Sequence, residues 1–274
     1  TTDTTGTIYY ADTSKGRTYY FAGNPTDNWV SFGGFYWRII RINEDGTIRI
    51  IYQGTGANTT GTGTQLQTST FSINSSTYNN NAYVGYMYTL NEVHGLGTDS
   101  GIKKVLDNWY RDNLATDYGD KIDGNAGFCG DRTPSSGTGL GTTATNYAAY
   151  NRLVSNKQPS FECTNSSDLY TTSGSSQGNK ALTYPIGLIS ADEVAFAGGV
   201  NGSTNQSYYL YTGQVYWTMS PYGVNGSGSA IVFIVSSSGR LYTNYVDGAL
   251  GVRPVINLKA NVQITGGNGS SSNP

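Results

Sequence analysis

Two apolar segments joined by an Asp-Gly dipeptide constrain the fold of this chain more than any other feature. Residues 35–42 and 47–52 are rich in β-branched and aromatic residues, and Asp45-Gly46 lies between them. Asp-Gly favours a type I′ turn, so this pattern predicts a β-hairpin. Because several positions are apolar on both faces of each arm, we expect the hairpin to be central in its sheet and covered on both sides.

Helical periodicity appears in two places. In residues 100–114 apolar side chains recur at i, i+3, i+4 and i+7, and either Asp99 or Ser100 can cap the start. The charged residues of this segment, Lys103 among them, lie on the opposite face, so we expect a helix half-buried against a sheet. A second, shorter helix is predicted over residues 190–197.

The C-terminal third predicts a second hairpin and a final strand. Residues 230–235 and 241–246 flank a Ser/Gly turn. Residues 251–258 form the last strand, in which Pro254 indicates an edge or bulge position.

The chain reads as one domain with two polar ends. We expect a domain over residues 17–260, an N-terminal arm over 1–16, and a Gly/Ser/Asn-rich linker or tail over 261–274. The sequence begins at Thr1 without a targeting segment, which indicates a processed product or an excised piece. No apolar run approaches the ~20 residues that span a bilayer, so we expect no transmembrane segment.

The composition excludes several classes of function. Charged residues make up 12% of the chain and the net charge is −2, so there is no basic field to attract nucleic acid. There is one histidine, His94, and there are two cysteines. Zinc hydrolase sites with two histidines, facial-triad iron sites and four-cysteine zinc sites are therefore excluded. Abundant Thr, Asn, Gly and Tyr with few Lys and Glu fit an exported protein.

The two cysteines, Cys129 and Cys163, lie within residues 115–180, which read as mostly loop. A loop of this length in a compact domain needs a tie. An even pair in an exported protein is most simply a disulfide, with Cα atoms about 5–6 Å apart. A reactive thiol pair is the alternative, although neither cysteine lies in a Cys-x-x-Cys motif.

No arrangement of residues indicates catalysis. His94 lies in a loop without a Gly-x-Ser-x-Gly nucleophile motif, and we expect it to be structural. Asp192 and Glu193 could be an acid pair, but they lie where a helix start favours acids.

Three aspartates recur at a spacing of three, which suggests calcium, but the other ligands of an EF-hand are missing. They are Asp117, Asp120 and Asp123. The glycines form neither of the common nucleotide-binding patterns. We therefore expect no metal, no cofactor and no enzymatic activity.

The C-terminal motifs resemble a known family. The run Trp217 to Pro221 (WTMSP), the hairpin around Gly239, and residues 251–258 (GVRPVINL) resemble the C-terminal half of bacterial C-type-lectin-like domains. These domains are related to the formylglycine-generating-enzyme fold and to the variable proteins of diversity-generating retroelements. The resemblance covers most of residues 17–260.

The resemblance implies an α+β fold of C-type-lectin-like architecture. Two helices would pack on twisted antiparallel sheets with long loops, and the first and last strands would lie close together. The calcium-dependent sugar-binding signature of animal C-type lectins is absent, and the two cysteines do not match the catalytic pair of the formylglycine enzyme. Neither of those two activities is implied.

The family's pattern also assigns faces to the second hairpin. Val232, Val235, Leu241 and Val246 would point inward, with a bulge or twist near Ile234. Tyr, Ser, Gly and Asn are the residues that antibodies use to bind antigens. The hairpin and the loop before it would then present a ligand-binding patch. The alternative is an ordinary hairpin whose outer face is only solvated. The patch is Tyr222, Asn225, Ile231, Phe233, Arg240, Tyr242, Asn244 and Tyr245.

We expect a non-catalytic ligand-binding domain, an adhesin or receptor-binding module, displayed extracellularly on a bacterial cell surface. The partner would be a host or bacterial surface protein or glycan. The alternative is a structural subunit of a surface filament, pilus or layer, whose partners are neighbouring copies of itself. A carbohydrate-active enzyme is a third possibility, for which we find no defensible carboxylate pair.

Overall fold

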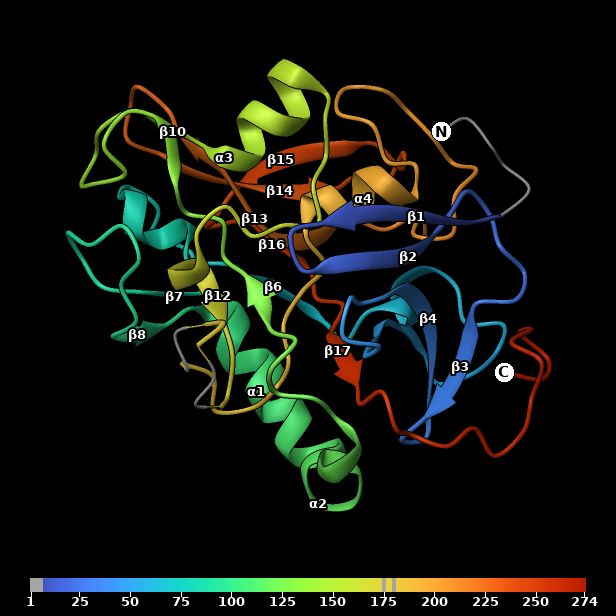
Figure 1. Cartoon of the computed structure of the whole chain (residues 1–274). Coiled ribbons are helices and arrows are strands. Elements are labelled where there is room, and N and C mark those ends of the chain that lie inside the picture. Colours follow the sequence, from blue (N-terminus) through green and yellow to red (C-terminus); the bar gives the residue numbers. More distant parts are fainter. Residues whose placement is uncertain (1–6, 174–175, 179–180) are drawn as a thin grey trace.

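The Asp-Gly hairpin lies inside a six-stranded antiparallel sheet. We describe a computed structural model that covers residues 7–173, 176–178 and 181–274 (Figure 1). The strand order is β1-β2-β4-β5-β17, and β3 pairs with β4. The strands are β1 (Thr7–Thr13), β2 (Gly16–Ala22), β3 (Trp29–Phe32), β4 (Phe35–Ile42), β5 (Ile48–Gly54) and β17 (Val255–Leu258).

The turn of this hairpin differs from the expected type I′. That type needs positive φ at both central residues, but only Gly46 has one, at 82°. The Gly46 amide donates to the Asn43 carbonyl, and the Asn43 amide donates to the Thr47 carbonyl. The hairpin prediction is confirmed. The predicted turn type is wrong, because the loop has three residues, 44–46, where a type I′ turn has two.

A second, seven-stranded sheet carries the C-terminal hairpin. Its main order is β10-β11-β13-β14-β15, β16 lies parallel to β13, and β6 pairs with β16. The strands are β6 (Thr68–Thr70), β10 (Pro134–Ser136), β11 (Thr145–Tyr147), β13 (Tyr216–Val224), β14 (Ala230–Val235), β15 (Leu241–Tyr245) and β16 (Ala249–Gly251). Two small antiparallel pairs complete the set: β7 (Met87–Tyr88) with β8 (Thr98–Asp99), and β9 (Phe128–Cys129) with β12 (Leu169–Tyr170).

The described residues form four α-helices where two were expected. They are α1 (Gly101–Asn113), α2 (Ala115–Tyr118), α3 (Ala148–Tyr150), which continues as a π-helix over Asn151–Asn156, and α4 (Ala191–Ala197). Four short 3-10 turns lie at Gly61–Thr64, Asn81–Val84, Gly119–Lys121 and Ser166–Asp168. The two predicted helices are confirmed as α1 and α4, and the two additional ones are three and four residues long. The fold is thus mixed α+β with mostly antiparallel sheets.

Serine caps set the starts of both predicted helices. The Ser100 side chain accepts from the Lys103 amide at the start of α1. At α4, Ser190 and Glu193 form a reciprocal capping box. The solvent-facing assignment of Lys103 is wrong, because its side chain is fully buried. Its ammonium lies 2.5 Å from Asp107 and 3.4 Å from Asp99, one helical turn away on either side, and these carboxylates balance its charge.

The first and last strands lie at opposite edges of the first sheet. We expected them to be close, but β17 pairs with β5 and β1 pairs with β2. Pro254 comes just before β17, where its missing N–H breaks no ladder bond, and its carbonyl accepts from the Tyr52 amide at 2.9 Å.

Both chain ends contribute to the folded body. Residues 7–16, which we expected in the N-terminal arm, form β1 and its turn onto β2. In the expected tail, the Gly269 carbonyl accepts from the Trp29 amide of β3 at 2.8 Å.

Candidate functional site

The structure divides the predicted ligand-binding patch. Phe233 is fully buried, so its outward assignment is wrong. The inward assignment of the four aliphatic residues is confirmed, since each of them is fully buried: Val232, Val235, Leu241 and Val246. The expected bulge or twist near Ile234 corresponds to a register shift in the β13–β14 pairing, where the extra residues lie in β13 between Trp217 and Pro221, opposite Ile234 and Val232. On the other side, β14 and β15 pair in continuous register. Consecutive residues of β14 from Val232 to Val235 are buried, so this part of the strand is covered on both faces and alternation does not leave one of them in solvent.

Two tyrosines of the patch are well exposed. Tyr242 is 45% and Tyr245 is 48% exposed on β15. Tyr242 lies opposite Ile234 and Tyr245 lies opposite Ile231, so strand alternation points them to opposite faces. Arg240 lies over the Tyr242 ring at 3.9 Å.

Three other members of the patch pack on neighbouring rings or hydrogen-bond to nearby backbone amides. The half-buried Tyr222 packs edge-on against Phe233 and Tyr150, at 5.2 and 5.0 Å. The Asn225 side chain accepts from two backbone amides of its own turn, and the Asn244 side chain accepts from the next amide. The predicted residues therefore do not form one continuous surface.

A polar cavity of about 290 Å³ lies elsewhere, bordered by the first sheet and the start of α4. Its wall comes from the β1–β2 turn at residues 13–15, from arginines of β4 and β5, from residues 160–163, and from the start of α4. Cys129 and Cys163 also line it.

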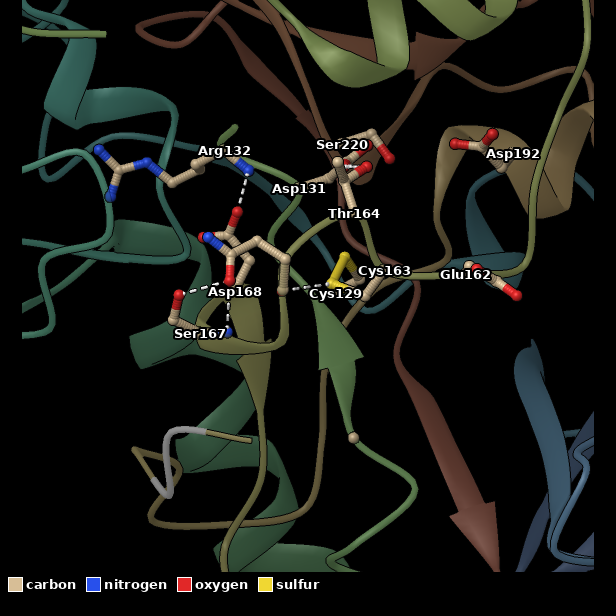
Figure 2. Close-up of a disulfide and its surroundings, with 12 residues drawn as sticks. Cys129, Asp131, Arg132, Glu162, Cys163, Thr164, Ser167, Asp168, Asp192 and Ser220 are labelled. Carbon is tan, nitrogen blue, oxygen red and sulfur yellow. Dashed lines mark hydrogen bonds between the residues drawn. A yellow bond between two sulfur atoms is a disulfide. The ribbon is translucent and has the colours of Figure 1, made fainter. Parts of the chain in front are cut away.

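The predicted disulfide is confirmed and borders this cavity. Cys129 and Cys163 are bonded, with their Cα atoms 5.5 Å apart. Figure 2 shows the bond between two groups of side chains, with Arg132 and Asp168 on one side and Glu162 and Asp192 on the other. The disulfide ties β9 to residues 160–163, which form part of the cavity wall.

One cluster of buried charges is centred on Glu193. Its carboxylate lies 2.6 Å from the Arg49 guanidinium and 3.2 Å from that of Arg41, and it accepts from the Ser190 amide at 2.9 Å. Burial alone would raise the pKa of Glu193, but the charges of Arg49 and Arg41 outweigh it and hold this pKa below its ordinary value. Glu193 is therefore ionised and fully engaged.

A second cluster is centred on Arg152 of the π-helix. Its guanidinium makes two 2.8 Å bonds to the Asp192 carboxylate and also pairs with Asp131. Thr164 donates to Asp131 at 3.0 Å, and the Ser160 amide donates to Asp192 at 2.9 Å. Asp192 and Glu193 thus sit at the helix start, as the sequence indicates, but each belongs to a different cluster.

The remaining candidates lie apart from the cavity. His94 hydrogen-bonds to Asp168, whose other oxygen accepts from the Arg132 amide at 2.7 Å. In the described ranges, no three His, Cys, Asp or Glu side chains are placed to hold a metal ion together, and this includes the aspartates at 117, 120 and 123.

Comparison with known proteins gives no relative: no protein-family model, no curated protein and no solved structure matches this chain. Among the residues that the structure describes, no helix combines the length and apolar character needed to cross a bilayer.

Sequence reasoning missed the cavity, although one signal pointed to it. Arg41 and Arg49 lie in strands that were expected to be covered on both faces. A charged side chain in such a strand requires a buried counter-charge. That requirement could have indicated a charged interior, but the identity of the partner depends on residues about 150 positions away.

Proposed function

We propose that this chain is a non-catalytic ligand-binding domain, and that its ligand occupies the cavity beside the disulfide. The observation that carries this proposal is that the buried charges of the cavity wall are paired with one another. Asp131, Asp192 and Glu193 each engage an arginine, so none is free to act as a base or nucleophile. Such a wall is rigid and presents fixed hydrogen-bonding groups.

The pairing favours a neutral, polar ligand. The wall carries four cationic and five acidic side chains, which nearly balance. At the buried part of the wall, an ionic ligand would have to draw a charge away from its partner, and this costs several kcal/mol. Hydroxyl groups can instead use the remaining lone pairs of the carboxylates and the hydroxyls of Ser160, Ser166 and Ser220. Phe161 and Leu169 supply apolar wall for C–H faces, so a saccharide fits best.

The disulfide supports an extracellular location, because such bonds persist in oxidising compartments. We place the domain on a bacterial cell surface, as an adhesin or receptor-binding module whose partner is a glycan. The C-type-lectin-like architecture that the C-terminal motifs suggest belongs to the same proposal.

A glycan array probed with the intact chain tests this function. We expect a saccharide to bind, and we expect Phe161→Ala, in the cavity wall, to weaken its binding by at least tenfold, about 1.4 kcal/mol. Tyr245→Ala is the matched control, since it removes an exposed aromatic ring from β15. It should leave binding unchanged.

Three results would overturn the proposal. The first is an array on which no glycan binds. The second is binding that Tyr245→Ala abolishes and Phe161→Ala preserves, which would place the site on the C-terminal hairpin. The third is a saccharide that the protein converts to a new product, detected by mass spectrometry.

A further inference from the structure

An exposed apolar row crosses the outer part of the first sheet. Tyr10 of β1 lies opposite Tyr19 of β2, and Tyr19 lies opposite Ile42 of β4. Ile8 lies two residues before Tyr10 and shares its face. These four side chains are 39% to 58% exposed. A row of large apolar side chains in solvent is typical of an interaction surface.

The row ends at an edge that lacks the usual protection. Within the described residues β2 is the only strand that pairs with β1, and Figure 1 shows β1 as the outer strand. Natural edge strands usually carry central charges, prolines or bulges that prevent pairing. The seven-residue β1 has one charged residue, Asp12, near its end, and Asp12 is paired with Arg17. Its register with β2 is unbroken.

We propose that β1 pairs antiparallel with β1 of a second copy of this chain, which gives a two-fold symmetric dimer. This inference does not depend on the cavity or its ligand.

Two registers of the pairing can be compared. In one register Ile8 lies opposite Tyr10 of the second copy, so two apolar cross-strand pairs form and each Asp12 lies outside them. In the register that opposes Tyr10 to itself, Ile8 would face the Asp12 carboxylate. The first register is therefore favoured, and it continues the apolar row from one copy to the next.

The opposite edge of the sheet explains why the assembly closes at two copies. On the outer side of β17, Gly187 bridges to Val255 and Ile122 bridges to Leu258. This edge is covered by the chain itself, so it cannot accept a strand from another copy. Strand β3, which pairs only with β4 among the described residues, is held on its outer side by the bond from the Trp29 amide to the Gly269 carbonyl. Because β1 would use the same edge in both copies, their pairing is isologous and gives a closed dimer and not an open filament.

Cross-linking tests the register directly. We mix the intact chain carrying Ile8→Cys with the intact chain carrying Tyr10→Cys under mild oxidation. We expect the mixed disulfide dimer to form at least about tenfold faster than either homodimer, because only facing positions meet. Equal rates for all three species, or no cross-link, would contradict the register.

Sedimentation velocity over a concentration series tests the dimer itself. We expect the wild type to dimerise, and Ile8→Lys/Tyr10→Lys to weaken the association by at least about 100-fold, as loss of interface anchors does. Tyr245→Lys is the control for an exposed aromatic ring elsewhere. Circular dichroism checks that each variant is folded, and single Ile8→Lys replaces the double variant if that one is not. A wild type that stays monomeric, a folded lysine variant that dimerises normally, or a wild type that forms filaments would overturn the proposal.

Discussion

Replacing Glu193 by glutamine tests the charge cluster that forms one wall of the cavity. Glutamine keeps the size of the side chain and can still accept the Ser190 amide, so the capping of α4 is preserved. It removes the negative charge that Arg49 and Arg41 share. The substitution therefore isolates the ionic contribution.

The expected loss of stability in Glu193→Gln depends on the partners that Arg41 and Arg49 keep. Arg41 still has Glu44 at 3.5 Å, but Arg49 has only neutral acceptors left, the carbonyls of Gly127 and Leu188 and the side chain of Asn257. Removing one partner of a buried ion pair costs about 3–5 kcal/mol. Because one of the two arginines remains paired, we expect the lower end, about 3 kcal/mol.

Urea unfolding at about pH 7 and about pH 4 measures this loss and its pH dependence. The folded-state pKa of Glu193 lies below the unfolded value. Its stabilisation is therefore fully present above the unfolded pKa, ordinarily about 4.3, and is lost as the pH falls through the folded pKa. The difference between wild type and Glu193→Gln should be constant near neutral pH and shrink in acid.

Glu162→Gln is the matched control, because this glutamate is exposed at the mouth of the same cavity. It should change the stability by less than about 0.5 kcal/mol. A loss below about 1 kcal/mol for Glu193→Gln, or a difference that grows in acid, would refute the assignment of Glu193 as an ionised, doubly paired carboxylate.

Four further outcomes follow from the structure. Replacing Cys129 and Cys163 by serine should cost about 3–4 kcal/mol in urea unfolding, because the bond closes a loop with a sequence separation of 34; an unchanged midpoint would contradict this. Phe233→Ala should cost about 3–5 kcal/mol as a cavity in the core, and a surface-like loss below 0.5 kcal/mol would restore its outward assignment. Lys103→Ala should cost about 3 kcal/mol, measured by thermal unfolding, because it removes a fully buried ammonium and leaves the partly buried carboxylate of Asp107 without its partner; a neutral effect would place the Lys103 side chain in solvent. His94→Ala should leave glycan binding unchanged, and loss of binding by a folded variant would give His94 a role at the site.

Local signals carried the parts of the fold that the sequence predicted well. The hairpin of β4 and β5, the start of α1 and the capping box of α4 depend on residues close together in the chain. The disulfide needed only two cysteines and a long polar loop. The hairpin and the helix starts have short-range causes, and two cysteines allow only one intramolecular pairing. No tertiary contact therefore had to be known to predict these features.

The missed features depend on long-range packing. Phe233 follows Val232 in β14, and their relative burial cannot be read from alternation when both faces of the strand are covered. Lys103 is buried because it lies on the buried face of α1 with Leu106 and Tyr110, where Asp107 balances its charge. The cavity needs Arg41 and Glu193 to meet, and nothing local encodes that meeting. The order of strands in the first sheet was missed for the same reason.

The disulfide lies on the cavity wall, so a ligand bound there, as proposed above, would be coupled to the redox state of this bond. Reducing the bond would free the segment before Cys163, which carries Phe161 and Glu162, from β9. A ligand that needs this segment in place would bind the oxidised form more tightly, and by linkage it would stabilise that form relative to the reduced one by at most RT ln(1 + [L]/Kd). The occupied protein would therefore have a lower reduction potential than the empty one. Binding would then persist in oxidising surroundings and weaken where thiols are abundant.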